Sequence, residues 1–290
     1  MGDTLPVLAP GLIEETVMAA LEEDGAYHDA TTSALIGPGD WGRGVLIAKE
    51  AGVIAGIAVA ATAFTLLDDS VSFDETATDG QWVESGTELA EVEGRLTALL
   101  SAERVALNFL QRMSGIATLT RAYVDAVDGT ATRILDTRKT TPGLRSIERY
   151  AVAAGGGRNH RFNLSDGVLI KDNHIAALRE RGVESIGAIL ARARAAAPHT
   201  MRIEIEVATP EEAEEAADAG ADIILLDNMD AADIRDSVRR IAGRAIVEAS
   251  GGVTLDNVRD IAAAGVDFIS VGRLTHSAPS LDISLELQGL

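Results

Sequence analysis

The side chains that could bind a small anion are concentrated between Arg133 and Arg179. This stretch carries nine lysines and arginines against four acidic residues, although the whole chain of 290 residues has a formal net charge of -20. The local balance of +5 leaves -25 for the rest. Basic groups gathered in an acidic protein concentrate positive potential, which favours a small anion as ligand. The alternative is a plain solvated surface, which is the commoner meaning of a charged stretch.

The candidate anion pocket consists of five residues in and around the sequence GGGRNHR: Arg138, Lys139, His160, Arg161 and Lys171. Arginine offers two parallel donors to a carboxylate and lysine a point charge, so the set suits a ligand with two carboxylates. Cations on both sides of His160 should lower its pKa, which predicts a neutral, hydrogen-bonding imidazole rather than a proton shuttle.

Two carboxylates follow or end apolar runs and are candidates for binding Mg²⁺ or sugar hydroxyls. Glu204 lies in the run IEIEV, where Glu206 shares its face, and Asp227 directly ends the run DIILL. A carboxylate in either place could also stabilise a cationic sugar. The competing explanation is ordinary solubility at the end of a strand.

Glycine-rich turns follow two later apolar runs and are candidates for binding a phosphate. They supply Ser250, Gly251 and Gly252 after AIVEA and Gly272 after FISV. Backbone N–H groups and the positive end of a following helix attract anions, and late loops of an α/β barrel are a usual phosphate position. A plain turn explains each glycine cluster equally well.

The elements that position these residues alternate between short apolar runs and helical stretches, which predicts repeated strand–helix units and a parallel sheet. The simplest architecture is an incomplete α/β barrel with its site at the carboxyl ends of the strands. We expect strands at Arg133–Asp136, Gly167–Ile170, Arg202–Val207, Asp222–Leu226, Ala245–Glu248 and Asp267–Val271, and helices that include Pro210–Ala219, Ala231–Ile241 and Leu255–Ala264.

The first part of the chain predicts a small α+β domain. We expect a helix over Leu12–Glu23, a strand with a turn over Gly44–Ile57, a short strand pair over Gln81–Leu89, a long amphipathic stretch over Ser101–Val127 that Gly115 interrupts, and a final strand over Leu281–Leu287. The predicted division is an N-terminal domain over residues 1–115, a catalytic barrel over 116–276, and a C-terminal segment over 277–290 that returns to the first domain.

Composition excludes several classes of function. The net charge argues against nucleic acid as a partner, and the lack of cysteine excludes disulfides, zinc–thiolate sites and a thiol nucleophile. The N-terminus has no basic region followed by a long apolar run, and no uninterrupted apolar run reaches about 18 residues. We therefore expect a cytoplasmic protein that does not bind membranes.

The ordered motifs ILDTRKTTPGLR, GGGRNHRFNLSDGVLIKDNHI, EIEV, LLDNM, EASGGV and VGRLTHS resemble the quinolinate phosphoribosyltransferases, and SAERVALNFLQRMSGIAT extends the resemblance upstream. It covers the chain from about Ser101 to Ser277. It implies two domains with an incomplete α/β barrel, in a homodimer or an assembly of dimers. The implied reaction joins quinolinate to phosphoribosyl pyrophosphate in NAD biosynthesis, with Mg²⁺, and releases pyrophosphate and carbon dioxide to give nicotinate mononucleotide.

The resemblance also implies roles for residues. Arg104, from the neighbouring subunit, joins the five residues of the candidate pocket in binding the substrate carboxylates and sugar phosphates. Glu204 and Asp227 face the ribose and Mg²⁺, directly or indirectly, and with Lys139 and Lys171 they are the implied catalytic residues. Ser250, Gly251, Gly252 and Gly272 take the 5′-phosphate. Arg273 stands where the family leads us to expect a small or variable residue.

Three other functions compete with this one. A phosphoribosyltransferase of the same fold could act on nicotinate or on another acidic heterocycle, but a single carboxylate would not need both Arg138 and Arg161. An aldolase-like barrel could use Lys171 as a Schiff-base nucleophile, because the lysine follows a predicted strand. A non-catalytic binding protein could retain the barrel, although the charged motifs are intact.

Overall fold

The computed structural model describes residues 5–288 and divides into two compact units, each described by itself. Unit 1 takes the chain up to Arg121, Lys139–Gly156 and the chain from Arg273 onwards, and unit 2 takes Ala122–Arg138 and Gly157–Gly272. Unit 1 thus includes Lys139–Gly156, a segment inside the predicted catalytic domain. No helix in the described part of the chain is long and apolar enough to cross a membrane.

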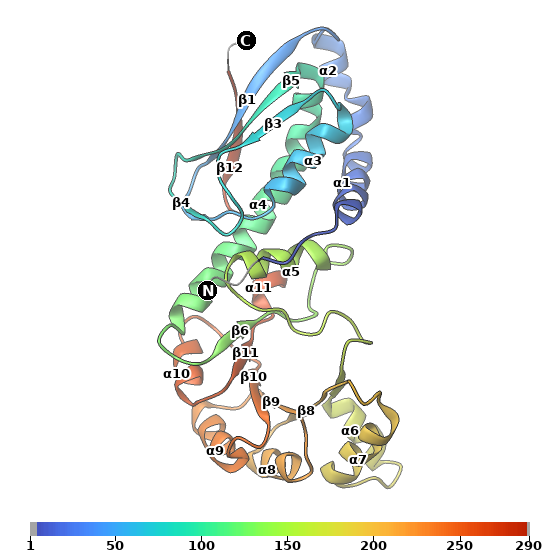
Figure 1. Cartoon of the computed structure of the whole chain (residues 1–290), viewed down its shortest axis with the longest axis vertical. Helices are drawn as coiled ribbons and strands as arrows, with labels where there is room; N and C mark the ends of the chain where they lie inside the picture. The colour runs from blue at the N-terminus through green and yellow to red at the C-terminus, as the bar shows by residue number, and fades with distance from the viewer. Residues whose placement is uncertain (1–4, 289–290) are drawn as a thin grey trace. The chain divides into compact units, whose positions relative to one another are not determined.

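Unit 2 contains a six-stranded parallel sheet in the order β6-β11-β10-β9-β8-β7, which confirms the predicted incomplete α/β barrel. Helices α6 to α10 form an arc around these strands (Figure 1). The elements are β6 (Arg133–Leu135), β7 (Val168–Ile170), α6 (Asp172–Arg179), α7 (Ile186–Ala196), β8 (Ile203–Val207), α8 (Pro210–Asp218), β9 (Ile223–Asp227), α9 (Ala231–Ile241), β10 (Ile246–Ser250), α10 (Val258–Ala263) and β11 (Phe268–Ser270).

Local sequence explains where the helices of unit 2 begin. Thr209 accepts the N–H of Glu212 at the start of α8, where Pro210 supplies the fixed φ of a first helical residue. Asp230 accepts two N–H groups at the start of α9. Each strand is short and rich in isoleucine, valine and leucine because helices bury its outer face. The outer-face residues of β8, for example Ile203 and Ile205, are fully buried.

Unit 1 contains a four-stranded antiparallel sheet in the order β12-β1-β5-β3 and a two-stranded sheet of β2 and β4. Figure 1 shows the last strand beside the first, in the register Arg43 to Gln288. The elements are α1 (Pro10–Asp24), the 3₁₀ helix η1 (Ala26–His28), α2 (Ala30–Leu35), β1 (Trp41–Ala48), β2 (Gly52–Val53), α3 (Ile57–Leu67), β3 (Ser72–Glu75), β4 (Trp82–Val83), β5 (Glu88–Arg95), α4 (Leu96–Ala126), α5 (Arg145–Ala154), α11 (Arg273–His276) and β12 (Ile283–Gln288). The end of α4, from Ala122 on, belongs to unit 2.

One expectation for the first part of the chain was confirmed in part, and another was wrong. The stretch over Gly44–Ile57 contains the expected strand, as the end of β1, and a bend after it, but a second short strand, β2, follows in another sheet and Ile57 already begins α3. The strand pair expected over Gln81–Leu89 is not a pair, because β4 bonds to β2 while β5 lies in the four-stranded sheet.

The interruption expected at Gly115 was also wrong, since α4 is one continuous helix of 31 residues. A Cβ atom at Gly115 would lie 1.9 Å from the carbonyl oxygen of Pro279, so this glycine makes room for the chain that leads to β12. Its cost in helix propensity, about 1 kcal/mol, is outweighed by this close packing.

Candidate functional site

A cavity of about 650 Å³ lies in unit 2, on the inner face of the parallel sheet. The first residues of four strands line it, so it reaches toward the amino ends of β7, β9, β10 and β11. Its lining comprises Leu135, Arg158, Asn159, His160, Arg161, Ser165, Asp166, Gly167, Val168, Thr200, Met201, Arg202, Glu204, Ile223, Ile246, Glu248 and Phe268. Two residues of the candidate anion pocket, His160 and Arg161, are among them.

The strand registers place carboxylates on this inner face. Glu204 is paired with Ile223, which is paired with Ile246, and all three line the cavity. Side chains alternate along a strand, so Glu206 and Glu248, two residues beyond Glu204 and Ile246, point to the same side. The inner face of an α/β barrel is usually packed with branched apolar residues, so buried carboxylates here need a specific partner.

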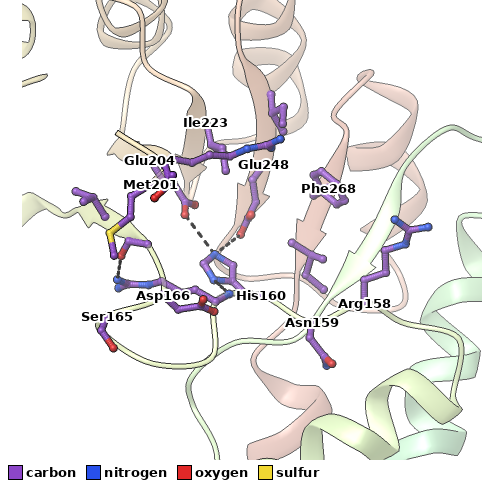
Figure 2. A pocket seen from close by; sticks show the side chains of 17 residues that line it. Arg158, Asn159, His160, Ser165, Asp166, Met201, Glu204, Ile223, Glu248 and Phe268 are labelled. Carbon is purple, nitrogen blue, oxygen red and sulfur yellow. Dashed lines mark hydrogen bonds and ion pairs between the residues drawn. The ribbon is translucent and has the colours of Figure 1, made fainter. Parts of the chain in front are cut away.

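His160 is that partner. Figure 2 shows Glu204 and Glu248 converging on its ring, with Nε2 3.4 Å from Glu204 Oε2 and 3.6 Å from Glu248 Oε1. Its Nδ1 accepts the N–H of Arg161 at 2.7 Å, and its own N–H donates to Asp136 Oδ1 at 2.7 Å. The side chains of Glu204 and Glu248 are only 6% and 3% exposed.

Burial and the neighbouring charges shift the pKa values in this cluster. Burial, with the charge of Glu204, raises the pKa of Glu248 to about 7. Burial alone would lower the pKa of His160, but the hydrogen bond to Glu204 and the charges of Glu248, Glu204 and Asp136 outweigh it, and the net shift is upward. The lowered pKa expected for His160 was therefore wrong, because its nearest charged groups are carboxylates from distant strands rather than the flanking arginines.

Arg138 and Arg161 lie near enough to affect each other. Burial, followed by the charge of Arg138, lowers the pKa of Arg161. Arg161 Nη1 also donates to the carbonyl of Gly167 at 2.8 Å, which fixes one end of the guanidinium beside β7. Two neighbouring guanidinium groups repel each other, and an anion bound between them would relieve that repulsion.

A second group of predicted residues lies at the carboxyl ends of the strands. Lys171 directly follows β7, is exposed, and its Nζ lies 3.3 Å from Glu206 Oε2. Asp227 ends β9, and its Oδ2 accepts from Asn228 Nδ2 at 2.8 Å. Glu204 is paired with Ile223, four residues before Asp227, so the structure does not bring Glu204 and Asp227 together. Carboxylate oxygens are suitable ligands for Mg²⁺. Because Glu206 lies nearer than Glu204 to the carboxyl end of β8, it is the better candidate to act together with Asp227.

The loop after β10 packs against the loop after β9. The N–H of Asn228 donates to the carbonyl of Ser250 at 2.9 Å. Gly251 has φ +88°, and a Cβ there would lie 2.2 Å from Asn228 Oδ1, so only glycine fits. Gly252 is exposed and also has a positive φ. This arrangement leaves backbone open to a ligand, whereas α10 begins only at Val258, six residues beyond Gly252.

The remaining predicted residues lie at or beyond the edge of unit 2. Gly272 is its last residue. Lys139 belongs to unit 1, is exposed, and its carbonyl accepts from Thr275 Oγ1 at 2.8 Å. Arg104 is exposed on α4, in unit 1, and Arg273 is the exposed first residue of α11.

Sequence reasoning missed two carboxylates around His160, namely Glu248, which lines the cavity, and Asp136, which lies behind it. Asp136 is fully buried and binds both the His160 N–H and Asn159 Nδ2, the latter at 2.6 Å. A signal for both existed, since each is a carboxylate inside or directly after an apolar run that helices would cover. The sequence did not indicate which partner would compensate their charge.

Comparison with known proteins places these features in a family. The chain matches the quinolinate phosphoribosyl transferase N-terminal domain over residues 29–114 and the C-terminal domain of the same family over residues 116–286. It is 45% identical over 265 residues to a probable nicotinate-nucleotide pyrophosphorylase [carboxylating] of Bacillus subtilis, covering 91% of this chain and 90% of that protein. It is 43% identical to the nicotinate-nucleotide pyrophosphorylase [carboxylating] of Mycobacterium leprae, covering 94% and 96%.

Solved structures agree. NadC from Streptococcus pyogenes superimposes with a TM-score of 0.93 at 45% identity, covering 98% of this chain and 99% of that one. The nicotinate-nucleotide pyrophosphorylase from Francisella tularensis gives a TM-score of 0.90 at 33% identity, covering 99% and 100%.

Proposed function

The chain belongs to the quinolinate phosphoribosyltransferase family, and we propose that it catalyses that family's reaction, a decarboxylating pentosyl transfer in NAD biosynthesis. Quinolinate and phosphoribosyl pyrophosphate give nicotinate mononucleotide, pyrophosphate and carbon dioxide. The observation that carries the proposal, beside the family match, is Arg161, which lines a cavity of about 650 Å³ on the inner face of an α/β barrel and feels the charge of Arg138. A cavity of this size accommodates a pyridine dicarboxylate.

Quinolinate has two carboxylates, and the cations of unit 2 suit both. The guanidinium groups of Arg138 and Arg161 donate hydrogen bonds to the carboxylates, and the contact with Gly167 orients that of Arg161. Lys171 adds a positive charge at the end of β7. The family resemblance adds Lys139, which follows Arg138 in the chain, and Arg104 of a neighbouring subunit. His160 faces the cavity but has its ring nitrogens engaged by protein groups, so it contributes through its position.

The sugar phosphate belongs at the carboxyl ends of the later strands. The loop of Ser250, Gly251 and Gly252 offers backbone N–H groups to the 5′-phosphate, and Gly272 ends the next strand's loop. The support for this part is the open backbone at Gly252 and the usual phosphate position in barrels.

Mg²⁺ fits a pair of carboxylates at the same ends of the strands. Glu206 and Asp227 lie on the inner face of neighbouring strands, whereas Glu204 is engaged with His160. Mg²⁺ is typically held by one or two carboxylates together with substrate phosphates, so Glu206 and Asp227 are the residues that would hold it or orient its waters. When bound, the ion neutralises charge on the pyrophosphate.

The protein's own groups then position the reaction. The carbon–oxygen bond to pyrophosphate lengthens with Lys139 and Lys171 neutralising the departing charge, while Asp227 and Glu206 stabilise the cationic ribose. The pyridine nitrogen, oriented by the carboxylate-binding arginines, forms the new bond to the sugar. Loss of the 2-carboxylate as carbon dioxide leaves an electron pair beside the cationic nitrogen, and a proton then takes its place. No covalent enzyme intermediate is needed.

The working form in this proposal is a homodimer or an assembly of dimers, with Arg104 contributed across the interface. The support is the family resemblance and the exposure of Arg104 on α4. The cytoplasm is the proposed location, because phosphoribosyl pyrophosphate is a polyanion that does not cross membranes unaided.

The test is a product balance with the purified protein. Incubation with quinolinate, phosphoribosyl pyrophosphate and Mg²⁺ should yield nicotinate mononucleotide, pyrophosphate and carbon dioxide in equal amounts. Carbon dioxide release without phosphoribosyl pyrophosphate, or nucleotide without carbon dioxide, would contradict the proposal. Borohydride trapping with a ketone substrate checks the aldolase alternative and should leave Lys171 unmodified.

A further inference from the structure

The segment from Arg158 to Arg161 (the closing segment) lies at the open side of the parallel sheet, between the edge strands β6 and β7. Beside β6, the N–H of Arg158 donates to the carbonyl of Ile134 at 2.8 Å, and the N–H of Asp136 donates to the carbonyl of Arg158 at 3.1 Å. Beside β7, the Arg161 guanidinium donates to the carbonyl of Gly167 at 2.8 Å. The closing segment is therefore held at both edges of the sheet and takes the place of a missing strand.

His160 is the residue of the closing segment that turns into the cavity between the two buried carboxylates (Figure 2). Its backbone N–H is bound by Asp136, its Nδ1 by the N–H of Arg161, and its Nε2 faces Glu204 and Glu248 at 3.4 and 3.6 Å. His160 is thus held through its backbone N–H and through both ring nitrogens.

The hydrogen bonds decide where the proton of His160 lies. The carboxylates favour a second proton on the ring, but a hydrogen on Nδ1 would point at the N–H of Arg161 across 2.7 Å. A hydrogen on Nε2 alone satisfies both sides, because Nδ1 then accepts and Nε2 donates to Glu204, while Glu248 Oε1 faces Nε2 as a charged neighbour at 3.6 Å. Any further proton in the cluster belongs to the carboxylate pair.

The same three side chains resemble a metal site by type. Their ligand atoms lie within 4.8 Å of one another, and one oxygen of Glu204 and one of Glu248 are buried without a hydrogen-bond partner. A metal, however, requires the lone pair of Nε2, and a metal-binding histidine donates from its other nitrogen. Here that other nitrogen accepts a hydrogen bond, so the cluster is arranged to hold the imidazole rather than an ion.

We infer that Glu248, together with Glu204, is a positioning residue for quinolinate: it holds the His160 ring, and the ring holds the backbone of Arg161, whose guanidinium receives a substrate carboxylate. The inference rests on the proposed function, because it assigns Arg161 to that substrate. Buried carboxylates on a barrel's inner face carry a desolvation cost that an apolar core would avoid, so their presence calls for a role beyond stability.

The experiment compares two variants of the whole protein. Glu248→Leu keeps the approximate volume and removes the carboxyl group that faces Nε2, so the KM for quinolinate should rise about 10-fold or more, while kcat and the KM for phosphoribosyl pyrophosphate stay within about 3-fold. Glu248→Gln keeps a polar oxygen facing His160 Nε2 and should remain within about 3-fold of the unaltered protein in all three constants.

A matched control comes from the same strand. Val247 is buried on the outer face of β10, so Val247→Ala should lower the thermal midpoint without changing the KM for quinolinate. A KM that rises equally in Val247→Ala and Glu248→Leu would show that the effect is general loosening, and would overturn the inference. The inference would also be overturned if the KM of Glu248→Leu for quinolinate stayed within about 2-fold of that of the unaltered protein. These comparisons require that the unaltered protein is active. If the unaltered protein shows no turnover, the proposed function is refuted rather than this inference.

A second measurement needs no folded variant of Glu248. In ¹⁵N-histidine-labelled protein at pH 7.5, the shifts of His160, assigned by their loss in His160→Gln, should be those of the Nε2–H form. A doubly protonated or Nδ1–H ring would overturn the inference. Calorimetric titration with Zn²⁺ should detect no tight site at this cluster, and a Zn²⁺ bound with loss of the Nε2–H signal would replace the positioning role by a metal site.

Discussion

Replacing Glu248 by glutamine should make the protein more stable at alkaline pH and leave its stability almost unchanged at acidic pH. Glu248 is 3% exposed, and burial with the charge of Glu204 raises its pKa to about 7, against an ordinary 4.5. The folded state therefore holds a proton on Glu248 over a pH range in which the unfolded chain has released it. Glutamine mimics this protonated carboxyl and does not titrate.

The sign and size follow from proton linkage. Between pH 4.5 and 7 the folded state binds more protons than the unfolded chain, so stability falls as the pH rises through that window. A shift of this size corresponds to about 3 kcal/mol of unfolding free energy at high pH, of which about 2 kcal/mol develops between pH 5.5 and 8.

The assay is thermal unfolding of both proteins at pH 5.5, 6.5, 7.5 and 8. The isoelectric point near 4.6 makes more acidic conditions unsuitable, because the protein would approach zero net charge. The advantage of Glu248→Gln over the unaltered protein should grow by roughly 4 to 8 °C between pH 5.5 and 8. Parallel pH profiles for the two proteins would refute the reasoning, since they would mean that Glu248 titrates as an ordinary carboxyl.

Three further predictions concern the site and one the scaffold. Lys171→Ala should lower kcat/KM about 10- to 100-fold, because it removes a cation at the substrate anions; full activity in steady-state assays would contradict its role. Asp227→Asn should raise the Mg²⁺ concentration needed for half-maximal rate about 10-fold, and an unchanged Mg²⁺ titration would remove Asp227 from the metal's surroundings. Co-expression of Arg104→Ala subunits with Lys171→Ala subunits should give mixed assemblies that are more active than either variant alone, whereas an activity no higher than that of the variants would argue against a shared site. Gly115→Ala should lower the thermal midpoint by several degrees, because its Cβ would lie 1.9 Å from the Pro279 oxygen, and an unchanged midpoint would show that α4 can shift.

The barrel could be predicted from the sequence because its signals are local. Each parallel strand is a short apolar run, and a polar or glycine-rich turn follows it, as at Asp227 and Gly251. Helix starts such as Thr209 and Asp230 have local caps. The residues at the carboxyl ends of the strands could therefore be named without knowing how the strands pair.

The cavity could not be predicted in the same way, because its chemistry depends on contacts between distant parts of the chain. Glu248 lies 88 residues from His160 along the sequence, and only the strand order places both beside Glu204. The direction of the His160 pKa was consequently wrong, since the flanking arginines are visible in the sequence and the opposing carboxylates are not. The helix interruption expected at Gly115 was wrong for a related reason, because Pro279, which packs against this glycine, is distant in the sequence.

A competition between quinolinate and nicotinate tests the central claim most directly. Equal concentrations of both would be incubated with the purified protein, Mg²⁺ and limiting phosphoribosyl pyrophosphate, with quinolinate labelled in its 2-carboxylate. The account predicts that labelled carbon dioxide accounts for all nicotinate mononucleotide formed, because the paired arginines Arg138 and Arg161 select the dicarboxylate. Nucleotide formed from nicotinate without release of the label would contradict the account and leave only the barrel and its sugar phosphate site standing.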